Sequence, residues 1–286
     1  MDGIILINKE KGYTSHDIVN IIKKTYNTKV GHTGTLDPNA TGVLPILLGK
    51  GTKISKYLIN HDKEYIATLK LGIKTTTADG EGDILEERNV NKDLLDINNI
   101  EKVLNEFIGI SEQRPPMFSA IKVNGKKLYE YARKGQSVDI KPRKIEIYDI
   151  ELLNINIEQN EIEFRVKCSK GTYIRTLCEN IAEKLGTIGY MKELKRTKVG
   201  DFDIQNSVTI DQVKNNSNLI KILTIEDMFK TYNSINIYDK QTELLLNGVK
   251  IKTHKTDGIY KLYSLSNVFI GVGIVENESL KIDIRV

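Results

Sequence analysis

Apolar and polar positions at the start of the chain predict a strand followed by a helix. Gly3 to Asn8 is a short apolar run, as expected of a buried strand. A helix is expected to begin at Thr14 or Ser15, with Asp17 in its first turn, because a hydroxyl residue there precedes an apolar face at helical spacing. That face consists of Ile18, Val19, Ile22 and Tyr26.

The segment from Gly31 to Gly42, GHTGTLDPNATG, predicts a long loop. It contains three glycines, one proline and several Thr, Asn and Asp residues, a composition that favours turns over regular structure. Long irregular loops inside compact domains are often functional, so this segment is a candidate for a functional site.

The middle of the chain predicts strands and helices in an irregular order. Glu64 to Gly72 alternates in the manner of a strand. The other expected elements are helices at Thr52–Ile59, Ile100–Ile108, Leu128–Arg133 and Tyr173–Leu185, strands at Lys144–Ile157 and Ile162–Cys168, and a Pro-Pro loop at Gln113–Met117. Because no βαβ rhythm appears, the predicted fold is mixed α/β (α+β), a largely antiparallel mixed sheet with flanking helices.

The last part of the chain is β-rich. After a polar stretch at Lys214–Asn218 and a helix near Ile225–Phe229, four short strands are expected at Ile235–Tyr238, Gly258–Leu265, Val268–Val275 and Leu280–Val286. We therefore expect two domains, a large one over residues 1–230 and a small one over residues 231–286.

Composition and charge narrow the classes of protein only slightly. A net charge of +4 and a pI near 8.7 do not by themselves establish a nucleic-acid partner, although lysines and arginines recur in short clusters. The amino-terminal apolar run is broken by Asn8 and Lys9, so it matches neither a signal peptide nor a membrane span, and a cytoplasmic protein is expected. Cys168 and Cys178 support neither a disulfide framework nor a four-ligand zinc site.

No motif for a cofactor or a metal is complete. The glycines at 42, 49 and 51 do not have Walker A spacing, and the acidic residues from Asp79 to Asp83 lack the glycine and glutamate that a calcium loop requires. The four histidines show no paired metal-ligand spacing. We expect no cofactor and no metal.

Asp37 is the only acidic residue of the loop. It precedes Pro38, which favours extended backbone geometry and places the carboxylate on a turn. Taken alone, an Asp-Pro pair is more often an Asx-type turn stabiliser than a catalytic group.

The loop and several later segments resemble the TruB family of tRNA pseudouridine synthases. Gly31 to Pro45 (GHTGTLDPNATGVLP) resembles that family's catalytic motif over all fifteen residues. The similarity continues in order through Lys63–Tyr65, Leu71–Gly72, Thr75–Gly82, Arg114–Lys122, Gly125–Arg133 and Cys168–Leu177, and extends to about Val199. Leu244–Gly248 and Phe269–Gly273 resemble, more weakly, a PUA-like RNA-binding domain. Departures are Glu10 in place of a proline, Thr76 in place of an acid and Lys195 in place of an arginine.

The resemblance implies an isomerase that needs no cofactor. Such an enzyme breaks the N-glycosidic bond of the T-loop uridine at position 55 of tRNA, rotates the uracil and rejoins it through C5. Asp37 would be the catalytic carboxylate, Arg175 its counter-ion, and Tyr65 the ring that stacks on the flipped base. His32, Tyr173 and Leu194 would bind the nucleotide, with Lys9 and Asp79 as supporting residues of the same set.

Without the resemblance, several of these residues fit ordinary structural roles equally well. Tyr65 fits a cross-strand packing residue, His32 a polar turn residue, and Arg175 a surface arginine at a helix start, where the dipole disfavours a cation. At the level of the whole chain, the alternatives are a non-catalytic RNA-binding protein and an RNA-guided uridine isomerase that works with partner proteins. We expect a monomer that acts on the T-stem-loop of tRNA without an obligate protein partner or a membrane. The atom that Asp37 attacks or deprotonates stays open.

Overall fold

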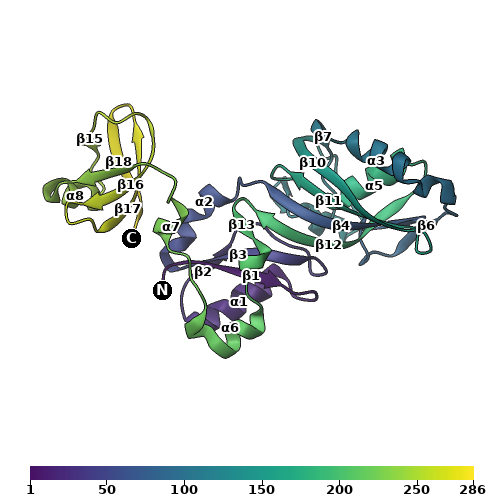
Figure 1. Cartoon of the computed structure of the whole chain (residues 1–286), viewed down its shortest axis with the longest axis horizontal. Coiled ribbons are helices and arrows are strands. Elements are labelled where there is room, and N and C mark those ends of the chain that lie inside the picture. Colours follow the sequence, from purple (N-terminus) through teal and green to yellow (C-terminus); the bar gives the residue numbers. More distant parts are fainter.

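A computed structural model describes residues 1–286 and contains two main sheets (Figure 1). The larger has nine strands in the order β1-β3-β12-β4-β11-β10-β7, with β2 beside β3 and β13 beside β12. These strands are β1 (Gly3–Lys9), β2 (Val30–His32), β3 (Thr41–Leu48), β4 (Lys63–Leu71), β7 (Gly109–Gln113), β10 (Arg143–Asn156), β11 (Glu161–Cys168), β12 (Gly189–Val199) and β13 (Phe202–Asp203). Only β3 and β12 pair in parallel, which confirms the predicted mixed, largely antiparallel sheet.

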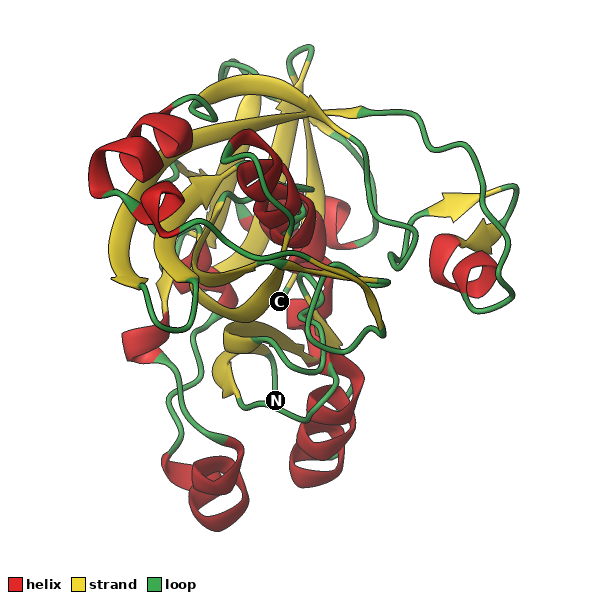
Figure 2. Cartoon of the chain, turned by 90° about the vertical axis from the view of Figure 1, so that its right-hand side faces the viewer, coloured by secondary structure: helices red, strands yellow, loops and turns green.

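Eight α-helices accompany the sheets (Figure 2). They are α1 (Ser15–Tyr26), α2 (Ser55–Leu58), α3 (Ile97–Asn105), α4 (Leu128–Ala132), α5 (Ile174–Lys184), α6 (Ile210–Asn216), α7 (Ile225–Met228) and α8 (Asp239–Leu246), with 3-10 turns at Gly49–Ile54, Lys92–Leu95, Ile204–Asn206 and Ser217–Leu219. Helix α1 packs with α6, whereas α3 and α5 pack on β10, β12 and β4. As predicted, Thr14 caps α1, and it forms a capping box with Asp17. No helix has the length and apolar character that crossing a bilayer requires.

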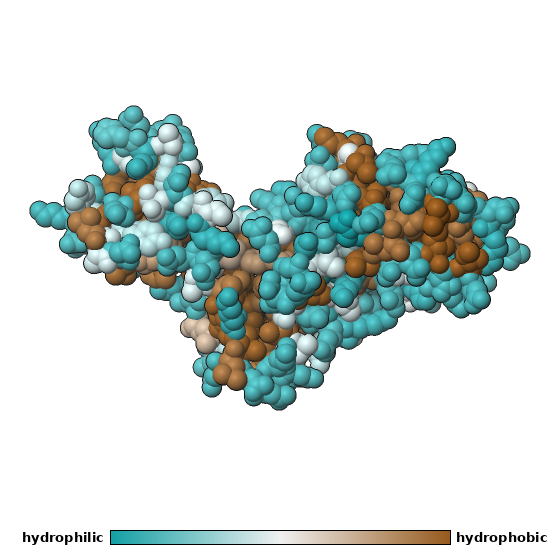
Figure 3. Space-filling model, viewed as in Figure 1, coloured by the Kyte–Doolittle hydropathy of each residue, from teal (hydrophilic) through white to brown (hydrophobic).

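The second sheet lies beyond α7 and is drawn in yellow and green at the left of Figure 1. It has five strands in the order β14-β16-β17-β18-β15: β14 (Ser234–Ile237), β15 (Ile251–Lys252), β16 (Gly258–Ser264), β17 (Phe269–Glu276) and β18 (Ser279–Arg285). Val272 and Ile284 of this sheet belong to the same buried cluster as Ile4 and Phe229. The Tyr57 hydroxyl also donates to the carboxylate of Asp283. The two sheets are therefore joined by a packed contact. In the view of Figure 3, hydrophilic side chains cover most of the surface on either side of this contact.

The structure corrects several boundaries. The segment Gly31–Gly42 is not wholly irregular, because β2 includes Gly31 and His32 and β3 begins at Thr41. The helix expected at 52–59 is a 3-10 turn followed by the four residues of α2, and the one expected at 100–108 is α3, which ends at Asn105. The small ladders β5 (Ile73–Thr75) with β6 (Ile84–Glu87) and β8 (Lys122–Val123) with β9 (Lys126–Lys127) were not expected.

Two central strands were also not expected from the sequence. Strand β3 contains Pro45, which argues against an internal strand. The structure accommodates it because β12 pairs with β3 only at Thr41 and Gly42 and β2 pairs only from Ile46 onward, so Pro45 has no ladder partner on that side. In β12, a bulge between Met191 and Glu193 interrupts the alternation of buried and exposed residues by which strands are recognised.

Candidate active site

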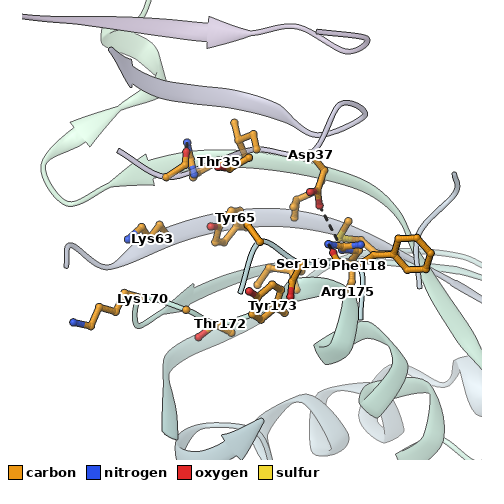
Figure 4. Close-up of a pocket in the computed structure, with 18 of the residues that line it drawn as sticks. Thr35, Asp37, Lys63, Tyr65, Phe118, Ser119, Lys170, Thr172, Tyr173 and Arg175 are labelled. Atoms are coloured by element: carbon orange, nitrogen blue, oxygen red, sulfur yellow. Dashed lines mark hydrogen bonds and ion pairs between the residues drawn. The ribbon is translucent and has the colours of Figure 1, made fainter. Parts of the chain in front are cut away.

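A cleft of about 490 Å³ opens over the middle of the nine-stranded sheet (Figure 4). Its walls come from the loop before β3, from β4, from the segment after β7, from the turn before α5, and from β12. The residues that line it are Gly34–Asp37, Ile59, Lys63, Tyr65, Phe118–Ala120, Tyr129, Ser169–Arg175, Met191, Leu194 and Arg196. A volume of this size suits a single nucleotide or a comparably small ligand.

Arg175 lies between two carboxylates at the wall of the cleft. Its Nε is 3.4 Å from Asp37 Oδ2, and its Nη1 is 3.2 Å from Asp79 Oδ2. Its Nη2 also donates to the Phe118 carbonyl at 2.8 Å. Only 7% of Arg175 is exposed, so the alternative prediction of a surface arginine at the helix start is wrong. A buried cation shared by two acids links the Asp37 loop to the start of α5.

The neighbours of Asp37 in the chain fix its position. The Ser15 hydroxyl donates to the Leu36 carbonyl at 3.0 Å and accepts from the Leu36 N–H at 2.9 Å. On the other side, the Pro38 carbonyl accepts from Lys9 Nζ at 2.9 Å and from the Gly12 N–H at 3.0 Å. The Asp37 carboxylate has no hydrogen bond within its own loop, and its side chain is 40% exposed. The arrangement therefore presents the carboxylate to the cleft and does not use it as an Asx turn.

Tyr65 lies on β4 below Asp37 (Figure 4), between Val166 of β11 and Arg196 of β12. Burial raises the pKa of its hydroxyl, and the nearby Arg196 guanidinium opposes that effect. Tyr173 is held across the cleft by both hydrogen bonds of the buried Gln113 amide, at 2.7 and 3.0 Å. Together with Leu194 these rings form apolar walls beside a carboxylate, a setting that suits a flat heterocycle.

The sequence-predicted residues divide into two groups. Asp37, Tyr65, Arg175, Tyr173 and Leu194 all line the cleft. Lys9, Asp79 and His32 do not line it.

Lys9, Asp79 and His32 lie behind or beside the cleft. Lys9 is fully buried, and its ammonium donates to the carbonyls of Glu10, Tyr13 and Pro38. Asp79 supports Arg175 from behind. His32 pairs with Ile46 on β3, and its buried Nδ1 has no hydrogen-bond partner.

Sequence reasoning missed several cleft residues, among them Arg196. It is 1% exposed and lies on β12. Lys63 at the start of β4 and Phe118–Ala120 were also missed as lining residues. An arginine in an alternating buried position would have been a signal for Arg196, but the bulge in β12 hides that alternation.

Gly42 is expected to tolerate no side chain. Its φ is +109°, and a Cβ built there would lie 2.2 Å from the Arg196 carbonyl oxygen, which is backbone and cannot move aside. We expect Gly42→Ala to lower the free energy of unfolding by about 2–4 kcal/mol. Urea denaturation measures the loss. Gly109→Ala is the control, because Gly109 has a φ of +107° but open space around it, and an equal loss in the two variants would contradict a steric cause.

Lys9 is expected to make stability depend on pH. Burial lowers the pKa of its ammonium from the ordinary value of 10.5 to about 8. Between these values the unfolded chain holds more protons than the native one, so the contribution of Lys9 to the unfolding free energy increases as pH rises from about 8 to 10.5. Urea denaturation at several pH values should show a steeper rise for the wild type than for Lys9→Met. If the unfolding free energies of the two proteins changed with pH at the same slope, the lowered pKa of Lys9 would be contradicted.

Known proteins resemble the chain along almost all of its length. The model of the TruB family pseudouridylate synthase N-terminal domain matches residues 22–174, and that of the tRNA pseudouridylate synthase B C-terminal domain matches residues 175–229. The protein named tRNA pseudouridine synthase B of Clostridium tetani is 45% identical, with 99% of this chain and 98% of that protein covered. The protein of the same name from Caldanaerobacter subterraneus subsp. tengcongensis is 41% identical, with 98% of each covered.

Solved structures agree with the sequence comparisons. A chain in the crystal structure of a Cbf5–Nop10–Gar1 complex superimposes with a TM-score of 0.70 at 26% identity, over 99% of this chain and 84% of that one. The two family models together span the sheet from β2 through β13, which includes every wall of the cleft. These matches show that the chain belongs to the TruB family of pseudouridylate synthases.

Proposed function

We propose that this chain converts the uridine at position 55, in the T-loop of tRNA, to pseudouridine, with Asp37 as the catalytic carboxylate. The observation that supports it most is the position of the Asp37 carboxylate, which lies at the mouth of the cleft beside buried Arg175 and above the Tyr65 ring. Relatives that are 41–45% identical over nearly their whole length carry the name tRNA pseudouridine synthase B.

The reaction breaks one bond to the sugar and forms another. The N1–C1′ bond of uridine is cleaved, the uracil turns, C5 bonds to C1′, and the proton lost from C5 is balanced by one gained at N1. A carboxylate beside the sugar stabilises or traps the electron-poor intermediate, as carboxylates do in glycoside chemistry. The Tyr65 ring offers a stacking surface for the extruded base, and Tyr173 and Leu194 enclose it.

Lys9, Asp79 and His32 have supporting roles in this proposal. Lys9 holds the Pro38 carbonyl next to Asp37, and Asp79 holds Arg175. His32, two residues before Gly34 of the cleft wall, contacts the RNA that surrounds the flipped nucleotide. None of the three needs to touch the reacting atoms.

We propose a division into two domains, which the presence of two separate main sheets supports. Residues 1–230 carry the reaction, and residues 231–286 form a PUA-like domain that contacts RNA phosphates outside the T-loop. We propose that the protein acts in the cytoplasm as a monomer without an obligate protein partner. Gel filtration with light scattering tests the monomer, and activity of the purified chain alone tests its independence.

An isolated tRNA T-stem-loop labelled with tritium at C5 of its uridines tests the function. Tritium release, with pseudouridine found at position 55, is the expected result. Tight binding of the RNA without release would instead favour the RNA-binding alternative. Release only in the presence of a guide RNA or added proteins would favour the RNA-guided alternative.

A further inference from the structure

Arg196 combines deep burial with a position in the cleft wall. It heads the fully buried side chains when these are ordered by size, at 1% exposure, and it lines the cleft. Burial lowers the pKa of its guanidinium. Its hydrogen bonds go to backbone carbonyls, and no carboxylate lies within ion-pair distance of it. Because a buried charge without a counter-ion opposes folding, filling space does not account for an arginine there.

The carbonyls that Arg196 binds flank Asp37. Its Nε donates to the Val43 carbonyl at 2.9 Å, and its Nη2 donates to the Gly34 carbonyl at 3.2 Å. Gly34 precedes Asp37 and Val43 follows it, so a single planar guanidinium spans the two ends of the loop. The backbone of Arg196 also pairs with Gly42, the residue directly before Val43. The rigid fork of an arginine therefore fixes the width of the loop at its base.

Tyr65 is the direct cross-strand partner of Arg196 on β4. The Arg196 guanidinium opposes the rise in the pKa of the Tyr65 hydroxyl that burial causes, as expected of a cation on the paired residue of the neighbouring strand. The same side chain that holds the Asp37 loop therefore also holds the orientation of the ring below it.

We propose that Arg196 is a positioning residue of the isomerisation, holding the base of the Asp37 loop and the Tyr65 hydroxyl at a fixed spacing around the extruded uracil. It acts through Asp37 and Tyr65 and touches neither the sugar nor the base. The proposal rests on the proposed function, since it assigns Arg196 to that reaction.

Arg196→Lys tests the role of the fork, because lysine keeps the charge but cannot span both carbonyls and the hydroxyl. We expect the single-turnover rate on the T-stem-loop to fall by on the order of 10²-fold, as for other small displacements of reacting groups, while the RNA dissociation constant stays within about threefold. Arg165→Lys is the matched control. Arg165 lies on β11, which β4 separates from β12, and it pairs with Glu151, Asp149 and Glu64 without lining the cleft, so the rate of this variant should not change.

A second variant and a double-mutant cycle keep the test decisive. Arg196→Met fills similar space without a buried charge and should fold with the same loss of rate. In a Tyr65→Phe background, part of the Arg196→Lys effect should disappear, because one of the groups it positions is absent; a merely structural role would leave the two effects additive.

Three results would overturn the proposal. They are a folded Arg196→Lys or Arg196→Met enzyme within about fivefold of the wild-type rate, a loss of RNA affinity as large as the loss of rate, and failure of both variants to fold. If the wild-type chain formed no pseudouridine, the proposed function itself would be wrong. The wild-type assay precedes every Arg196 variant, so this failure is distinguished from a failure of the Arg196 proposal.

Discussion

Asp37→Asn is expected to lower the single-turnover rate of pseudouridine formation by on the order of 10⁴-fold or more, the scale seen when a central catalytic group is removed. Asparagine has the same shape but cannot carry the negative charge or form a bond to an electron-poor carbon. Stability should change little, because the lost ion pair with Arg175 is 3.4 Å long and the Asp37 side chain is 40% exposed. Tritium release from C5-labelled T-stem-loop measures the rate.

Asp211→Asn is the matched control for this variant. Asp211 lies on α6 with a side chain that is 77% exposed and does not line the cleft, so its loss should leave the rate unchanged. RNA affinity should be similar in wild type, Asp37→Asn and the control, since binding energy comes mainly from the phosphate backbone. If Asp37→Asn released tritium at a rate within about tenfold of the wild-type rate, Asp37 would not be the catalytic carboxylate.

Elements with a clean local pattern could be predicted from the sequence. Strand β4 alternates along its length, and α1 has both a cap and an apolar face, so each was placed within one residue of its observed bounds. Strands β3 and β12 could not be predicted in the same way. In β3 the cause is Pro45, which the strand accommodates only because neither β12 nor β2 pairs with it at that residue. In β12 the cause is a bulge that interrupts the alternation of buried and exposed residues. Both depend on pairing between distant segments.

The candidate site shows the same division between local and long-range information. Asp37 was found because its loop has an unusual composition and a fifteen-residue similarity to a known motif. Arg196 was not assigned a role, although its guanidinium donates to a carbonyl at each end of that loop. Its role depends on β12 pairing with β3 on one side and with β4 on the other. A carboxylate on a loop can be recognised locally, but the groups that hold it in place cannot.

Arg175→Met is expected to damage both stability and activity. The side chain of Asp79 is 11% exposed and would lose its ion-pair partner, and breaking a buried pair on one side costs about 3–5 kcal/mol. The rate should fall by roughly 10³-fold, because Asp37 loses the only charged group that contacts it. Urea denaturation and single-turnover kinetics measure the two losses separately.

The double variant Arg175→Met with Asp79→Asn separates the two effects. Asparagine removes the unpaired buried charge while its side-chain oxygen still accepts from the Thr77 hydroxyl and the Glu81 N–H, as the carboxylate of Asp79 does. We therefore expect the double variant to regain about half of the lost stability, since a neutral amide costs less to bury than a charge. Its rate should stay low, because Asp37 still lacks its cation. Recovery of the rate together with stability would show that Arg175 serves the fold alone, and the catalytic part of its assignment would then be wrong.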